Sequence, residues 1–194
     1  VNISLLKKWN AESLAELTLA AAIGYDWLFN SLPVHSRSII GTAIYEKSLR
    51  NITQLEGLDE ESLTAFAYGA LATMERAPEF YSEFIRKVIA HCNTTILSDK
   101  ALNDFAYSDF ASLAEDITDK VVLVAALQSA LGKECGLTLP EGFMQSAEYL
   151  DFMVAPSGVT YDFGNLPSTP SVVAAKYWFA SQADDASVVT ADER

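Results

Sequence analysis

Apolar side chains recur every three or four residues through most of this chain, and this period restricts its segments to amphipathic helices. The clearest stripe consists of Leu63, Phe66, Ala67, Ala70, Leu71 and Met74. Residues three and four apart share one face of an α-helix, whereas a half-buried strand would need alternating ones. The pattern predicts helices over residues 10–30, 33–51, 59–74, 78–96, 108–131, 140–153 and 170–183. The chain is therefore predicted to be all-α.

The predicted helices follow one another through short connections, which favours antiparallel helix hairpins. The run Val121–Leu127 is apolar on all sides of its helix, so we expect it to be buried between other helices. Successive hairpins around an inner layer are typical of helical solenoids and of α/α toroids. We expect part of an α/α toroid, which is either an incomplete toroid or a solenoid.

The chain length of 194 residues suits one domain with a real core, and half of the residues are hydrophobic. Residues 1–194 are predicted to form a single helical domain. The last residues, Val188–Arg194, read as the beginning of a further element. We expect the chain to be a piece of a larger protein.

Charge and apolar run length exclude several classes of partner. The formal net charge of −13 repels nucleic acid phosphates, and the 13 Lys and Arg residues are scattered. The longest apolar runs fall far short of the roughly 20 residues of a membrane span, so no membrane insertion is expected. Cys92 and Cys135 are not paired in a CxxC motif. No metal and no cofactor are predicted.

Three stretches resemble polysaccharide lyases of the heparinase II/III and alginate lyase type. The first runs from Ala20 through Tyr25-Asp26-Trp27 to Pro33 and is followed by Arg37, similar to an alanine-rich helix with Tyr-Asp-Trp, Leu and Arg in that family. Gly142–Tyr149 and Ala155–Gly158 are similar to its "GF, TGEY, GPTG" region. The resemblance implies an α/α toroid that cleaves acidic polysaccharides by β-elimination, in a periplasmic or secreted setting.

The motifs that carry the chemistry of this family differ in this chain. Glu56–Glu60 stand where an Asn-Trp stretch is expected, and an acid there would repel a uronate carboxylate. The glycine-rich catalytic loop corresponds to Asp99–Ser108, in which Asp104 and Tyr107 are retained. Residues Tyr161–Asn165 replace a Phe-Asn-Tyr-x-Asp sequence.

Tyr107 is the catalytic candidate, because a phenol in a polar loop can act as the base or acid of an elimination. A structural role at the helix start is the alternative. Tyr25, Asp26 and Trp27 are predicted to bind substrate, since aromatic faces stack on sugar rings and a carboxylate accepts sugar hydroxyl groups. A buried Asp26 that caps a neighbouring helix would explain the same residues. Tyr161 lies in the segment richest in Gly, Pro and aromatics and is assigned to the same substrate site.

Two hypotheses about function follow. In the first, the chain handles an acidic oligosaccharide or polysaccharide, either by β-elimination or by binding only, and is a polysaccharide lyase if active. In the second, it is a catalytically inactive helical scaffold or protein-interaction module that kept the fold, because a fold does not determine a function.

Overall fold

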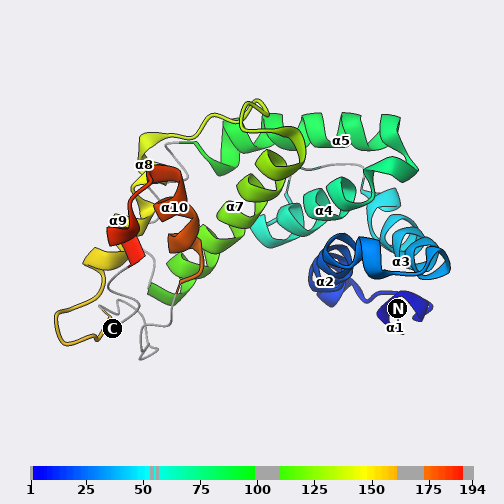
Figure 1. The fold of residues 1–194 in the computed structure, drawn as a ribbon, viewed down its shortest axis with the longest axis horizontal. Coiled ribbons are helices and arrows are strands. Elements are labelled where there is room, and N and C mark those ends of the chain that lie inside the picture. The colour runs from blue at the N-terminus through cyan, green and yellow to red at the C-terminus, as the bar shows by residue number, and fades with distance from the viewer. Residues whose placement is uncertain (1, 53–54, 56, 99–109, 161–172, 190–194) are drawn as a thin grey trace. The chain divides into compact units, whose positions relative to one another are not determined.

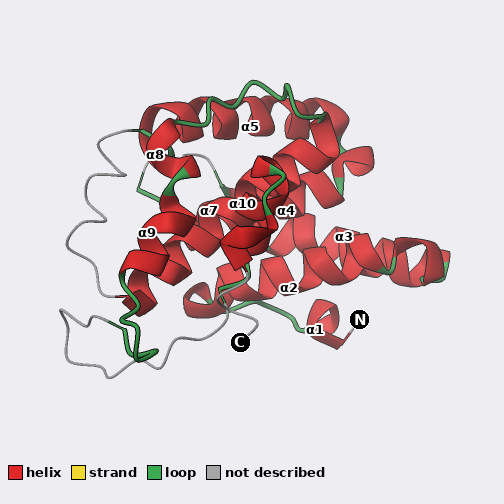
Figure 2. Cartoon of the chain, turned by 60° about the vertical axis from the view of Figure 1, so that its left-hand side comes forward, coloured by secondary structure: helices red, strands yellow, loops and turns green. Residues whose placement is uncertain are grey.

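The computed structural model describes residues 2–52, 55, 57–98, 110–160 and 173–189. Within these ranges the chain consists of helices joined by turns and loops (Figures 1 and 2). No strand occurs in the described part, and an isolated antiparallel bridge joins Val154 to Thr160. The prediction of an all-α fold is confirmed. The toroid arrangement stays a prediction.

The chain divides into two compact units. Unit 1 contains Val1–His91 and Ala126–Cys135, and unit 2 contains Cys92–Ala125 and Gly136–Arg194. The division falls within the long helix α7 (Phe110–Leu131), whose last residues belong to unit 1. No helix among the described residues is both long enough and apolar enough to cross a membrane.

Unit 1 is built around four helices that match the predicted ones closely. They are α2 (Leu14–Trp27), α3 (Val34–Lys47), α4 (Glu60–Ala72) and α5 (Pro78–His91). The short helix α1 (Asn2–Leu5) precedes them, and 3-10 turns connect them at Ala11–Ser13, Phe29–Ser31, Leu49–Asn51 and Met74–Arg76. Within this unit α2 packs most extensively on α4.

Small side chains let α2 and α4 approach closely. Ala22 on α2 and Ala65 on α4 are fully buried. A Cβ added at Gly69 would lie 3.2 Å from Cγ2 of Thr18 and 3.3 Å from Cγ2 of Ile44, which is tighter than ordinary van der Waals contact. Close packing of this kind keeps neighbouring helix ends in a defined position, because packed interiors tolerate few voids.

Local signals in the sequence explain where several helices begin and end. The Asp59 carboxylate accepts a hydrogen bond of 2.8 Å from the Ser62 amide, as expected of an N-cap. Hydrogen bonds from the Ser62 side chain and from this amide lower the pKa of Asp59. Gly132 follows the end of α7 with a φ of 90°, a conformation that glycine adopts without strain. At the end of α3, the Lys47 ammonium donates to the carbonyl groups of Ser4 and Leu6, which ties the first residues to this unit.

Unit 2 holds most of α7, the short helices α8 (Glu141–Met144) and α9 (Ser146–Phe152), and α10 (Ala175–Ala183). Phe143 on α8 packs edge-on against Phe179 on α10, with ring centroids 5.3 Å apart. The buried Lys176 ammonium pairs with the Asp151 carboxylate at 2.7 Å, which connects α10 to α9. The apolar run Val121–Leu127, whose last two residues belong to unit 1, is largely buried, as predicted, and Leu123, Val124 and Leu127 are at most 2% exposed.

Two predicted helices are interrupted in the structure. The helix over 78–96 changes at Cys92 into a π-helix (Cys92–Ile96), in which the Leu97 amide reaches back to the Cys92 carbonyl at 2.8 Å. The Asn93 side chain donates to the Gly136 carbonyl and accepts from the Thr138 amide, both at 2.8 Å. These two bonds satisfy backbone polar groups of Gly136 and Thr138 in the loop that follows α7. The helix over 140–153 breaks at Gln145 into α8 and α9.

Candidate pocket at three helix ends

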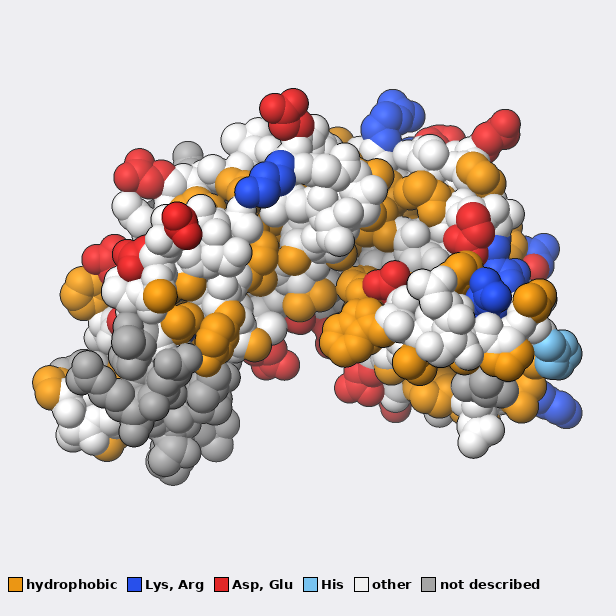
Figure 3. Space-filling model, in the orientation of Figure 1, with side chains coloured by type: hydrophobic (Ala, Val, Ile, Leu, Met, Phe, Trp, Pro, Cys, Tyr) orange, Lys and Arg blue, Asp and Glu red, His pale blue; other side chains and the backbone are white. Residues whose placement is uncertain are grey.

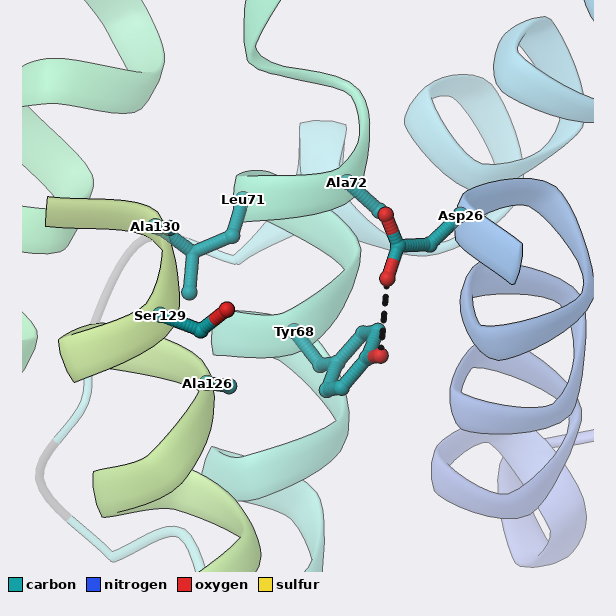
Figure 4. A pocket seen from close by; sticks show the side chains of 7 residues that line it. All are labelled: Asp26, Tyr68, Leu71, Ala72, Ala126, Ser129 and Ala130. Atoms are coloured by element: carbon teal, nitrogen blue, oxygen red, sulfur yellow. Dashed lines mark hydrogen bonds between the residues drawn. The ribbon is translucent and has the colours of Figure 1, made fainter. Parts of the chain in front are cut away.

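A pocket of about 240 Å³ opens in unit 1 beside the end of α2 (Figure 4). Three helices line it: α2 contributes Asp26, α4 contributes Tyr68, Leu71 and Ala72, and α7 contributes Ala126, Ser129 and Ala130. Pockets that enclose drug-sized ligands have volumes of roughly 300–1,000 Å³. This pocket suits one small group of a larger ligand, such as a single sugar ring.

Asp26 and Tyr68 provide the polar groups on one side of the pocket. The Tyr68 hydroxyl donates a hydrogen bond of 3.0 Å to Oδ2 of Asp26, across 42 residues of sequence. Burial raises the pKa of Tyr68, and its hydrogen bond to the Asp26 carboxylate raises it further, while the Trp27 indole acts in the opposite direction. The phenol therefore keeps its proton at neutral pH. It serves as a donor and not as a base.

Ser129 and the apolar side chains complete the lining. Ser129 lies in the last turn of α7 with its hydroxyl directed toward the space between α7 and α4 (Figure 4). Leu71 and Ala72 are half-buried and offer an apolar surface. The pocket thus combines an apolar wall with one carboxylate, one phenol and one aliphatic hydroxyl.

Trp27 is the most exposed large apolar side chain among the described residues, at 78%. It is the last residue of α2 and follows Asp26 directly. The Trp27 indole lowers the pKa of Tyr68, the hydrogen-bond partner of Asp26. Of the predicted substrate-binding residues, Asp26 therefore lines the pocket, and Trp27 directly follows it in the chain.

Tyr25 lies in the core and not at the pocket. Its side chain is only 2% exposed, and its hydroxyl donates a bond of 2.7 Å to the Glu75 carboxylate. Burial and this bond raise the pKa of Tyr25. The Tyr25 ring also packs edge-on against Phe29, at 5.4 Å between centroids. This placement corrects the expectation that its ring faces a sugar, because successive residues of a helix point in different directions.

Arg37, which belongs to the same motif as Tyr25, also supports the local structure. Its guanidinium lies 4.6 Å above the Phe29 ring, and its Nε donates to the Leu32 carbonyl at 3.1 Å. Arg76 in turn donates to the Arg37 carbonyl at 3.1 Å. These contacts hold the connection between α2 and α3.

Tyr107 and Tyr161, the other predicted site residues, lie outside the described residues. Their assignments to catalysis and to substrate binding stay predictions. Tyr68 and Ser129 were missed by sequence reasoning. Tyr68 falls off the apolar stripe of α4, which is the only signal that could have marked it, because its partner Asp26 is distant in sequence.

The residues that line the pocket include no histidine and only one carboxylate. In the part of the chain that the structure describes, no three His, Cys, Asp or Glu side chains gather to hold a metal ion. Acidic side chains are spread over the visible face (Figure 3). His35 is exposed in the first turn of α3, and His91 ends α5.

No family model matches this sequence, and no curated protein matches it at a significant level.

Proposed function

We propose that unit 1 binds an oligosaccharide at the pocket formed by Asp26, Tyr68 and Ser129, with Trp27 as the stacking surface. The observation that carries the proposal is the exposed Trp27 indole beside a carboxylate–phenol pair. Burying an aromatic side chain of this kind stabilises a fold by about 1.5–3 kcal/mol, so an indole left in solvent next to a pocket favours a ligand partner.

The chemistry of the pocket matches a sugar in each of its parts. A sugar ring has an apolar C–H face, which packs on an indole, and hydroxyl groups at its edge. Asp26 accepts hydrogen bonds from such hydroxyls, and Ser129 both donates and accepts. A pocket with few polar groups on an otherwise apolar wall is typical of small-molecule sites.

The test compares matched removal of two exposed aromatic side chains. Neutral, amino and uronate oligosaccharides are titrated by calorimetry into the wild type, Trp27→Ala and Phe152→Ala. Phe152 is 71% exposed but belongs to unit 2, so it controls for the loss of any exposed ring. We expect Trp27→Ala to weaken binding about tenfold, which corresponds to roughly 1.4 kcal/mol. Equal effects of both variants, or no binding of any sugar, would remove this proposal in favour of the scaffold hypothesis.

β-Elimination of an acidic oligosaccharide is the second candidate, and the resemblance of the Tyr25–Arg37 region to lyases favours it. Tyr68 does not supply the base, because its raised pKa keeps it protonated. Tyr107 is the proposed base or acid. The protein is incubated with alginate, hyaluronan and heparan while the absorbance of the unsaturated product is followed. Activity that exceeds a Tyr107→Phe control supports elimination, and absence of product leaves binding as the function.

A further inference from the structure

We infer that the pocket selects a sugar bearing a free primary amine over a neutral or a uronate sugar. This inference deepens the proposed oligosaccharide binding and rests on it. The geometry that points to it is the convergence of three helix C-termini around a single carboxylate.

Each helix that lines the pocket contributes residues at or near its last turn. Asp26 is the next-to-last residue of α2, Ala72 is the last residue of α4, and Ala130 is the next-to-last residue of α7 (Figure 4). The C-terminal end of a helix carries the equivalent of about −0.5 elementary charge. Three such ends and the Asp26 carboxylate make the pocket attractive to a cation.

Among the described residues, the three helices that line the pocket have no basic side chain of their own at these ends. The last turns of α2, α4 and α7 contain no basic residue. By contrast, α3 and α5, the other long helices of unit 1, carry Lys47 and His91 in their last turns. Lys, Arg and His at a C-terminus normally offset its negative potential. The last turns of these three helices therefore do not offset the potential themselves, which favours an external cation.

The Asp26 carboxylate has capacity for such a cation. Its Oδ2 accepts the Tyr68 hydroxyl, and Oδ1 receives no hydrogen bond from the described residues. An ammonium that donates to this oxygen forms a charge-assisted bond, which is roughly twice as strong as a neutral one. The faces of Trp27 and Tyr68 add cation–π attraction.

The lining favours an organic ammonium over a metal ion. A calcium ion takes 6–8 oxygen ligands, whereas the pocket offers one carboxylate and two hydroxyl groups. The half-buried Leu71 and Ala72 supply the apolar contact that a sugar ring uses and a metal ion does not. A uronate would bring its own carboxylate toward Asp26 and the helix ends, and would be repelled.

The experiment titrates three oligosaccharides of equal length into the whole chain: a glucosamine oligomer, its N-acetylated twin and an alginate oligomer. We expect the glucosamine oligomer to bind about tenfold more tightly than the acetylated twin, since only the free amine can form a charge-assisted bond with Asp26. The alginate oligomer should bind most weakly. The preference should shrink as salt is raised, because the exposed part of this field is screened.

Two variants at the pocket and one remote control separate local charge from total charge. Asp26→Asn keeps an oxygen for the Tyr68 hydroxyl and should bring the two glucosamine oligomers to within about threefold of each other. Ser129→Lys places a cation at the end of α7 and should favour alginate instead. Glu16→Gln changes the net charge as much as Asp26→Asn, on an exposed site of the same helix, and should leave the preference unchanged.

Each outcome decides between the inference and the function on which it rests. Loss of preference in Asp26→Asn, with binding of the acetylated oligomer retained, supports the inference. Equal binding of the twins by the wild type, or tightest binding of alginate, overturns the inference while sugar binding stands. A trilysine peptide that binds as tightly as the glucosamine oligomer also overturns it, because charge alone would then be selected. If none of the sugars binds, the proposed function itself fails.

Discussion

Unit 1 contains two tyrosine–carboxylate pairs between the same segments, and they serve different purposes. Tyr25 on α2 donates to Glu75 just after α4, and Tyr68 on α4 donates to Asp26 on α2. The first tyrosine is buried at 2% exposure, whereas the second lines an open pocket. The Tyr25–Glu75 bond has a structural role, because the Tyr25 ring is enclosed in the core. The same kind of bond between Tyr68 and Asp26 lies at a pocket, where a ligand can reach it.

The contrast arises from neighbouring positions on one helix. Tyr25 and Asp26 are adjacent in sequence, and consecutive residues of an α-helix are separated by about 100° around its axis. One therefore faces the core of unit 1 while the next faces the pocket. Four measurements test whether this division between a structural pair and a binding pair is correct.

The largest expected effect is the loss of stability when the buried ring is removed. Tyr25→Ala should lower the free energy of unfolding by about 3–5 kcal/mol, because a cavity forms and Glu75 loses its donor. Tyr68→Ala should cost less than half as much, since Tyr68 is only partly buried. Urea unfolding followed by circular dichroism measures both. Equal losses would show that the two rings are equally structural.

The next effect concerns the ligand and not the fold. Trp27→Ala should leave the free energy of unfolding within about 0.5 kcal/mol of the wild type, as is usual for exposed positions. Its oligosaccharide affinity should nevertheless fall about tenfold. Tyr25→Phe is the matched control, because it alters the neighbouring core pair and should preserve affinity. A strongly destabilised Trp27→Ala would place this indole with the structural pair.

Removal of each hydroxyl alone should separate the pairs more finely. Tyr25→Phe should cost about 1 kcal/mol of stability, the net contribution of one hydrogen bond, and should not change ligand affinity. Tyr68→Phe should cost less in stability, because Asp26 is exposed and water can replace the donor. It should weaken sugar binding severalfold. Calorimetric titration and chemical unfolding of the same samples measure both quantities, and reversed effects would exchange the roles assigned to the two pairs.

The smallest effect is expected in alkaline solution. Burial raises the pKa of both Tyr25 and Tyr68 above the ordinary value of 10.0. Above pH 10.0 the unfolded chain therefore loses these protons while the folded chain retains them, and stability declines until the pH passes the folded pKa values. Below that range the full stabilisation is present. Replacement of both tyrosines by Phe should flatten this decline, which thermal unfolding across the alkaline range measures; an unchanged slope would contradict the assignment.

Some features of this protein were determined by its sequence alone. The stripe from Leu63 to Met74 was sufficient to predict α4, because a period of 3.6 residues is a local property of the chain. Asp59 was identified as the start of that helix, since an N-cap needs only the next turn. Asp26 and Trp27 were selected from a local motif; the structure places Asp26 in the lining of the pocket and Trp27 directly after it in the chain.

Other features depended on contacts between distant segments. The sequence did not show that Tyr25 points into the core while Asp26 meets Tyr68, or that the π-helix at Cys92 forms where Asn93 reaches Gly136. The sequence also did not predict that the ends of α2, α4 and α7 line one cavity. Helix formation is decided within a few turns of chain, so sequence patterns reveal it. The pairing of side chains across the tertiary structure depends on how closely helices such as α2 and α4 pack, and only the folded structure determines that.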